Sequence, residues 1–137
     1  MIVVVDASAA LDFLLRDEAS FEWLEQRLGA GGALAAPHLL DTEVAHVLRK
    51  HVLRGRLDEG RAAEALADLD DLSLDRYAAR PLLARIWELR HNLTGYDATY
   101  VALAEALDAP LVTSDQRLLD LPAPASPATI ESKHGTR

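Results

Sequence analysis

The pattern of hydrophobic positions predicts strands that alternate with helices. Residues 2–5 are an uninterrupted run of Ile and Val, which is typical of a strand buried on both faces of a parallel sheet. Residues 33–36 and 72–74 are shorter apolar runs that predict further strands, and residues 110–113 read as another buried strand. This alternation predicts an α/β domain with a mostly parallel sheet and right-handed crossovers.

Helices are marked by capping residues and by apolar residues at helical spacing. Ser8, Ser20, Asp58 and Thr94 stand where helix N-caps are expected, and Pro81 suits the first turn of a helix. The longest amphipathic pattern runs from residue 39 to the glycine at 55. A last short helix is predicted to open at residues 114–115. Each predicted strand up to residue 113 is therefore followed by at least one helix.

The C-terminal end of the chain differs in kind. Residues 122–127 read Pro-Ala-Pro-Ala-Ser-Pro and cannot form a helix, because proline lacks the backbone N–H that a helix needs. A brief edge strand is predicted at residues 129–130, and a frayed tail is expected from Glu131 onward. We expect one domain at residues 1–121 and a C-terminal extension at residues 122–137.

Composition and charge narrow the function classes. The 137 residues carry a net charge of −8, which argues against nucleic-acid binding by bulk electrostatics but leaves open a site where carboxylates hold cations. The chain has no cysteine, so disulfides, thiolate catalysis and cysteine-based zinc sites are excluded. No signal peptide and no membrane-spanning run is visible, and we expect a cytoplasmic protein.

Two aspartates come directly after predicted strands. Asp6 ends the first strand, and Asp115 lies two residues beyond the strand at residues 110–113. Ligands of parallel α/β sheets bind outside the carboxyl ends of the strands, so both side chains are expected at one rim of the sheet. Each aspartate alone is equally compatible with a helix cap or a turn.

Two further acids are singled out by their helical positions. On a helical wheel, Glu43 falls at the margin of the apolar stripe of its helix, and Asp97 falls inside the apolar face that includes Tyr96 and Tyr100. A buried unpaired carboxylate is costly. Asp97 therefore caps its own helix with Thr94, pairs with an arginine such as Arg117, or binds a metal together with other carboxylates. Oxygen-only ligands favour Mg²⁺ or Mn²⁺.

The four acids and their neighbours resemble a known family. Val4-Val5-Asp6-Ala7-Ser8, Leu40-Asp41-Thr42-Glu43-Val44, Tyr96-Asp97-Ala98 and Leu111-Val112-Thr113-Ser114-Asp115 look like the motifs of PIN-domain nucleases, and most closely those of VapC-type toxins. The resemblance covers residues 1 to about 121. Successive acids are 37, 54 and 18 residues apart. The resemblance implies a three-layer α/β/α fold with a central sheet of four to five strands.

The resemblance also implies an activity, which is endoribonuclease cleavage of RNA with Mg²⁺, for which Mn²⁺ can substitute. Asp6, Glu43, Asp97 and Asp115 then map onto the acidic quartet, both as metal ligands and as catalytic residues. Ser8 and Thr113 map onto supporting hydroxyl positions. A bound metal lowers the pKa of a coordinated water from 15.7 toward neutrality, so no histidine is needed as a general base.

Arg117 departs from the pattern of the family, and the role of the other exposed basic residues is open. Many relatives carry a further acid two residues after the last aspartate, whereas this chain has Arg117, which either neutralises a carboxylate, contacts RNA phosphate or is a plain surface residue. A basic cluster supplies further candidate contacts to RNA or to an antitoxin. The alternative is that these residues are only the solvated end of a helix. The cluster consists of Arg49, Lys50, Arg54 and Arg56.

The resemblance further implies a homodimer and a VapB-type antitoxin as partners. The apolar residues at 62–72, together with those at 40–52, either offer a helix-binding groove for the antitoxin or are simply core. Three alternative functions compete with this one. A phosphoacceptor domain would need a lysine after a late strand, and Lys50 and Lys133 are in the wrong places. A non-catalytic interaction module and a PIN-domain nuclease of RNA processing stay open on the residues alone.

Overall fold

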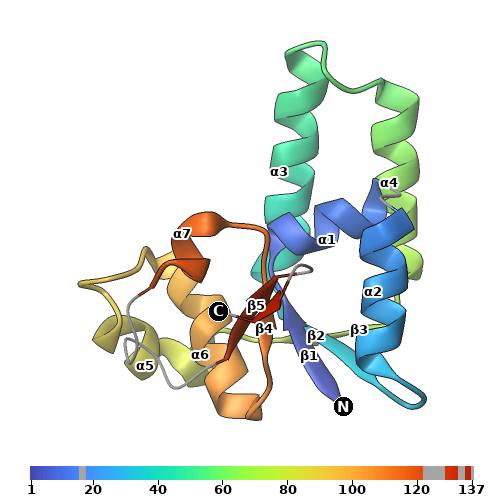
Figure 1. Ribbon diagram of the computed structural model, residues 1–137. Coiled ribbons are helices and arrows are strands. Elements are labelled where there is room, and N and C mark those ends of the chain that lie inside the picture. The colour runs from blue at the N-terminus through green and yellow to red at the C-terminus, as the bar shows by residue number, and fades with distance from the viewer. Residues whose placement is uncertain (16–17, 122–128, 133–134, 137) are drawn as a thin grey trace.

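In the computed structural model, a six-stranded sheet lies between two groups of helices (Figure 1). The structure describes residues 1–15, 18–121, 129–132 and 135–136. The strand order is β3-β2-β1-β4-β5-β6, in which the first five strands are parallel and β6 is antiparallel to β5. The strands are β1 (Ile2–Val5), β2 (Ala33–Pro37), β3 (Leu74–Tyr77), β4 (Leu111–Val112), β5 (Ile130–Ser132) and β6 (Gly135–Thr136). The predicted α/β class and mostly parallel sheet are confirmed.

The helices form two layers. Helices α1 (Ala7–Leu14), α2 (Glu18–Leu28), α3 (Leu39–Leu53) and α4 (Glu59–Asp71) form one group, in which α3 and α4 lie side by side (Figure 1). Helix α6 (Gly95–Leu107) packs on β1, β2 and β4, with α5 (Leu83–Glu88) and the short 3₁₀ helix η1 (Arg80–Leu82) against it. The last helix among the described residues is α7 (Gln116–Leu119). None of the helices in the described ranges is long and apolar enough to cross a membrane.

The core lies where β1 meets its neighbours. Val3, Val4 and Val5 are completely or almost completely buried, as expected for a central strand with helices on both faces. Strand β1 is paired with β2 on one side and with β4 on the other, in a register that places Val5 beside Val112. The residues after these two strands therefore emerge together at one edge of the sheet. That edge carries the candidate site.

Several predicted helix boundaries are confirmed. The side chain of Asp58 accepts a hydrogen bond from the N–H of Arg61 at the start of α4, and that of Thr94 accepts one from Asp97 at the start of α6. Pro81 lies in the first helical turn after β3. Helix α2 ends at Leu28, directly before glycines that adopt positive φ angles.

Two predicted caps are wrong. Asp6 caps α1 in place of Ser8, because its carboxylate accepts the N–H of Ala9 at 2.9 Å while the Ser8 hydroxyl turns back to Asp6. Helix α2 begins at Glu18, so Ser20 lies inside the helix and is buried. An acidic residue in the first turn interacts favourably with the helix dipole.

Two predicted strands also need correction. The third strand begins at residue 74 and not at 72, because an edge strand tolerates polar residues such as Arg76, which pairs with Asp41 at 2.7 Å. The frayed tail expected from Glu131 is instead strand β5, which pairs with β4 and is followed by β6. The strand at residue 130 is thus not at the edge of the sheet. The proline-rich segment at residues 122–127 lies outside the described residues.

Candidate functional site

The site begins with Asp6, which directly follows the buried strand β1. Its carboxylate accepts hydrogen bonds from the Ser8 hydroxyl at 2.7 Å, from the Ala9 N–H at 2.9 Å and from the Thr113 hydroxyl. Only 5% of Asp6 is exposed. Burial raises its pKa from 3.8 to about 6, against the lowering effect of the three hydrogen bonds and with a small further rise from the charge of Asp115.

Thr113 joins the ends of the two central strands. Its hydroxyl donates to Asp6 and accepts the backbone N–H of Asp115 at 2.9 Å. The Ser8 hydroxyl forms a parallel link, because it accepts the backbone N–H of Ser114 at 2.9 Å. The two hydroxyl positions singled out in the sequence therefore connect the Asp6 segment to the segment that carries Asp115.

Asp115 is the N-cap of α7, and it is neutralised by an arginine. One carboxylate oxygen accepts the backbone N–H of Arg117 at 3.0 Å, and the other accepts the guanidinium Nη2 of the same residue at 2.7 Å. The hydrogen bond from the Arg117 side chain is the largest reason why the pKa of Asp115 lies below its usual value. Arg117 thus adopts the neutralising role that was one of its three predicted alternatives.

Asp97 lies in the first turn of α6 and is partly buried, with 20% of its side chain exposed. Burial is the main reason its pKa is raised, and repulsion from Asp115 adds to the rise. The Thr94 hydroxyl caps the start of α6 by accepting the backbone N–H of Asp97, and the Asp97 carboxylate forms an ion pair with Arg117 at 3.5 Å, which is one of its three predicted environments. Tyr96, placed on the apolar face by the helical wheel, is instead 66% exposed, because it lies at the very start of α6, ahead of the buried stretch that begins at Ala98.

Glu43 reaches the same region from α3. Its side chain is half-buried, and burial raises its pKa, with a further contribution from the negative charge of Asp97. The hydroxyl of Tyr100 donates a hydrogen bond to Glu43 at 2.7 Å and acts in the opposite direction on this pKa. Each of the four acids is therefore within electrostatic reach of at least one other.

Tyr100 is the site residue that the sequence pattern did not identify. It was assigned to the apolar stripe of its helix, and it is indeed 2% exposed, yet its hydroxyl is the donor to Glu43. Burial, and then the hydrogen bond to Glu43, raises its pKa, so the hydroxyl stays protonated and remains a donor. The available signal was its spacing of three residues from Asp97, which places both side chains on one helix face.

The acids are close, but they do not form a ready-made metal cage. Among the described residues, no group of three Asp, Glu or His side chains is arranged so that it could hold a metal ion directly. Arg117 lies between Asp97 and Asp115, and Tyr100 engages Glu43. Two hydrogen-bonding nitrogens of one guanidinium thus take up carboxylate oxygens that a hard cation would otherwise use.

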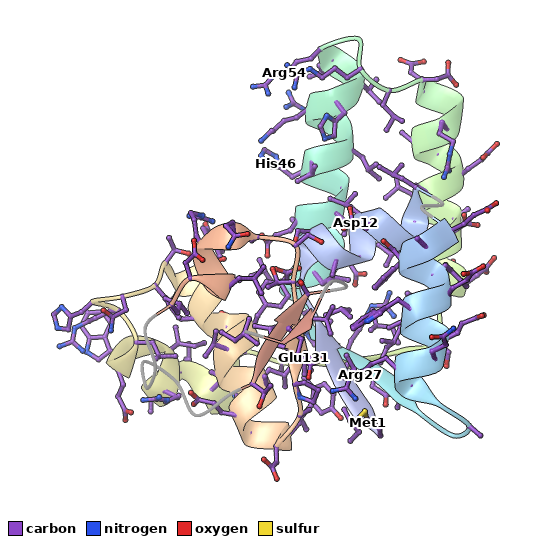
Figure 2. The ribbon with its side chains drawn as sticks, viewed as in Figure 1. Met1, Asp12, Arg27, His46, Arg54 and Glu131 are labelled. Atoms are coloured by element: carbon purple, nitrogen blue, oxygen red, sulfur yellow. The ribbon has the colours of Figure 1, made fainter. Side chains whose placement is uncertain are left out.

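The basic cluster of Arg49, Lys50, Arg54 and Arg56 lies along the outer part of α3 and the loop after it. Figure 2 shows His46 partway along this helix and Arg54 near its far end. Arg54 comes 11 residues after Glu43, which corresponds to about 16 Å along a helix axis. The outer end of the cluster, at Arg54 and Arg56, therefore lies away from the acidic pocket.

Comparison with known proteins agrees with this geometry. The PIN-domain family model matches residues 3–124. The chain is 45% identical over 128 residues to the VapC ribonuclease Mb0985 of Mycobacterium bovis, covering 93% of this chain and 97% of that protein. It is 47% identical over 129 residues to ribonuclease VapC1 of Mycobacterium tuberculosis, covering 93% and 95%. The chain therefore belongs to the PIN-domain family.

A solved structure supports the same fold at lower identity. The crystal structure of VapBC2 from Rickettsia felis, bound to a DNA fragment from their promoter, matches with a TM-score of 0.70 at 15% identity. The match covers 96% of this chain and 98% of that one. The three-layer arrangement expected from the motifs is thus shared with a known relative of the fold.

Proposed function

We propose that the protein is a divalent-metal-dependent endoribonuclease that acts as the toxin of a type II toxin–antitoxin pair in the cytoplasm. The observation that carries this proposal is the convergence of Asp6 and Asp115, from two neighbouring strand ends, with Asp97 and Glu43 from two helices. Relatives named VapC ribonucleases at 45–47% identity support RNA as the substrate and the toxin role. PIN-domain ribonucleases are generally dependent on divalent metals.

The donor set fits Mg²⁺ or Mn²⁺. All four groups offer carboxylate oxygens, and the pKa values of Asp6, Glu43 and Asp97 are raised by burial and further by a neighbouring negative charge, which a bound cation would offset. When bound, a divalent ion supplies a Lewis acid that lowers the pKa of water and stabilises charge on phosphate oxygens. Asp6, Glu43, Asp97 and Asp115 are the proposed ligands.

The surrounding residues hold these acids in place. Ser8 and Thr113 each hold one oxygen of Asp6, so that the carboxylate does not rotate. Tyr100 fixes one oxygen of Glu43 and leaves the other available. Removing a group that orients a metal ligand in this way typically costs about 10- to 100-fold in metal affinity or activity.

RNA binding by a protein of net charge −8 requires local positive charge. The basic cluster of α3 provides it outside the pocket, and its exposed arginines can contact phosphates away from the cleaved bond. We assign Arg49, Lys50, Arg54 and Arg56 this role. Replacing them is expected to weaken RNA binding and its salt dependence without affecting metal binding.

The antitoxin is proposed to occupy a cavity between α1, α2 and the end of α4. The cavity has a volume of about 550 Å³, and its apolar walls include Phe13, Phe21 and Leu72. Its rim carries four carboxylates, which favour a helix or strand with apolar and basic side chains. They are Glu18, Glu22, Asp68 and Asp71. This cavity shares Asp68, Asp71 and Leu72 with the groove expected at residues 62–72 but nothing with the stretch at 40–52, of which Leu40, Val44 and Leu48 are buried in the core.

A paired substitution tests this assignment. Glu22→Lys with Asp71→Lys is expected to abolish co-purification with a co-expressed VapB-type antitoxin. Glu64→Lys on the same helix as Asp71 serves as the control, because Glu64 does not line the cavity. Retained co-purification by the double variant would place the antitoxin elsewhere.

A homodimer is also proposed. Leu83 and Trp87 are 57% and 67% exposed and lie one turn apart on α5, which gives an apolar face that a second copy can cover. Sedimentation velocity is expected to show a dimer for the unchanged protein and a monomer for Trp87→Glu. A dimer for both the unchanged protein and Trp87→Glu would show that this face of α5 is not the dimer interface.

The nuclease proposal is tested on a labelled single-stranded RNA. Cleavage is expected with Mg²⁺ and not with EDTA, and the products should have linear phosphate ends, because water rather than the 2′-hydroxyl attacks the phosphorus. Cleavage that persists in EDTA, or cyclic 2′,3′-phosphate products, would contradict the proposal.

A further inference from the structure

A single arginine joins two of the four acids. The Nη2 atom of Arg117 lies 2.7 Å from Oδ2 of Asp115 and 3.5 Å from Oδ2 of Asp97, and its Nε donates to the other oxygen of Asp115 at 3.3 Å. The two carboxylates come from different elements, the first turn of α6 and the N-cap of α7. Arg117 is therefore the positive charge that lies between them.

The two acids are more buried than the arginine that joins them. The Asp115 carboxylate accepts the backbone N–H of Arg117 as a helix cap, and the backbone N–H of Asp97 donates to the Thr94 hydroxyl at the capped start of α6. Their side chains are 25% and 20% exposed, while that of Arg117 is 73% exposed. An exposed guanidinium moves into water at small cost, so it can leave the carboxylates without disturbing the core.

The guanidinium contacts the carboxylate oxygens of the two proposed metal ligands Asp97 and Asp115. A divalent ion held by Asp97 and Asp115 needs the oxygens that Arg117 now contacts, and a dication beside a guanidinium is repelled by it. The two cations cannot share these oxygens fully. Their binding is therefore competitive.

We propose that Arg117 is an internal counter-cation that pairs with Asp97 and Asp115 in the metal-free protein and that a divalent ion displaces. This inference rests on the proposed function, because it takes both aspartates as metal ligands. Arg117 then sets the metal concentration at which the enzyme becomes active. Since an exposed ion pair contributes little, removing Arg117 should tighten metal binding by about fivefold.

Calorimetric titration with Mn²⁺, without RNA, tests this directly. Arg117→Gln is expected to bind Mn²⁺ about fivefold more tightly than the unchanged protein. The matched control is Arg54→Gln, which removes the same charge at the far end of α3 (Figure 2) and should leave the affinity unchanged. Equal or weaker Mn²⁺ binding by Arg117→Gln would overturn the inference.

Thermal unfolding separates this role from a structural one. In EDTA, Arg117→Gln should melt at a lower temperature, because Asp97 and Asp115 repel each other without a cation between them. Saturating Mn²⁺ should remove most of this deficit, whereas the loss of a purely structural arginine would lower Tm equally in both buffers. Arg117→Lys keeps the charge and should be intermediate in both measurements.

The two proposals fail in different ways. If the unchanged protein binds Mn²⁺ and Arg117→Gln binds it no better, only the role of Arg117 is wrong. If the unchanged protein binds no Mn²⁺ at any concentration tested, the proposed metal-dependent function is wrong and this inference fails with it.

Discussion

The hydroxyl of Thr113 donates a hydrogen bond to the carboxylate of Asp6, a residue 107 positions earlier in the chain. The same hydroxyl accepts the backbone N–H of Asp115 at 2.9 Å, so one small side chain links two acids of the pocket. This link exists because β1 and β4 are neighbours and end in register, with Val5 beside Val112. The sheet topology thus positions the site, because Asp6 and Asp115 lie just beyond the ends of these two strands.

Thr113→Val tests the link itself. Valine keeps the shape but removes the donor to Asp6 and the acceptor for Asp115, so we expect kcat/KM for RNA cleavage to fall by about 10- to 100-fold. Thr99→Val is the control, since Thr99 is also buried but donates to Gly95 within α6, away from the acids. A Thr113→Val enzyme as active as the control would remove Thr113 from the account.

The pKa of Asp6 predicts a pH dependence of stability. Because burial raises this pKa from 3.8 to about 6, the folded state binds the proton more tightly than the unfolded state. The free energy of unfolding in EDTA should therefore fall as pH rises from about 4 to 6, by about 3 kcal/mol from this group. Asp6→Asn should lack that loss.

Urea unfolding of both proteins at pH 4 and pH 7 measures this effect. The difference between Asp6→Asn and the unchanged protein isolates Asp6, because all other groups titrate in both. The free energy of unfolding of Asp6→Asn minus that of the unchanged protein should therefore be more positive at pH 7 than at pH 4. A difference that does not change with pH would show that burial does not destabilise the charged form of Asp6.

Tyr100→Phe should alter the pH profile of cleavage. The hydrogen bond from Tyr100 lowers the pKa of Glu43, so its loss raises that pKa and moves the acidic limb of kcat/KM to higher pH. Tyr77→Phe, on the edge strand β3, is the control and should leave the profile in place. Superimposable profiles for Tyr100→Phe and the unchanged enzyme would count against Glu43 as a charged ligand.

The ion pair between Arg27 and Glu131 should stabilise the fold. Two hydrogen bonds of 3.0 and 2.7 Å join α2 to β5, and the Glu131 side chain is only 8% exposed; Figure 2 shows both residues close to Met1. A double-mutant cycle with Arg27→Met and Glu131→Gln should give a coupling energy of about 2 kcal/mol. The pair Arg61–Glu64, at 3.6 Å and with the Glu64 side chain 62% exposed, should give less than about 0.5 kcal/mol.

Local signals in the sequence predicted most of the fold. The Ile–Val run of β1 and the caps Asp58 and Thr94 are signals that act within a few residues, and each is confirmed. Strand β5 was only partly foreseen, because its stability depends on pairing with β4 and on Arg27, more than 100 residues away in the chain. The Ser8 cap failed because Asp6, two residues earlier, offers a stronger acceptor to the same helix end.

The acids of the site were predicted from the sequence, but their hydrogen-bond and ion-pair partners were not all predicted. Strand ends and helix faces identified four acids that the structure brings within electrostatic reach of one another. The hydroxyl of Tyr100 was missed because a helical wheel classifies tyrosine by its ring and not by its polar end. The choice among three roles for Arg117 required coordinates, since only they show the two carboxylates that it contacts.

The most direct test of the account is Mg²⁺-dependent cleavage of one labelled RNA by four single variants. We predict that Asp6→Asn, Glu43→Gln, Asp97→Asn and Asp115→Asn each lose at least 100-fold in kcat/KM, on the order of the effect of removing a metal ligand or its orienting partner. Asp41→Asn, an exposed acid on the same helix as Glu43, should retain full activity. Unchanged activity in any two of the four variants would contradict the claim that these acids act together.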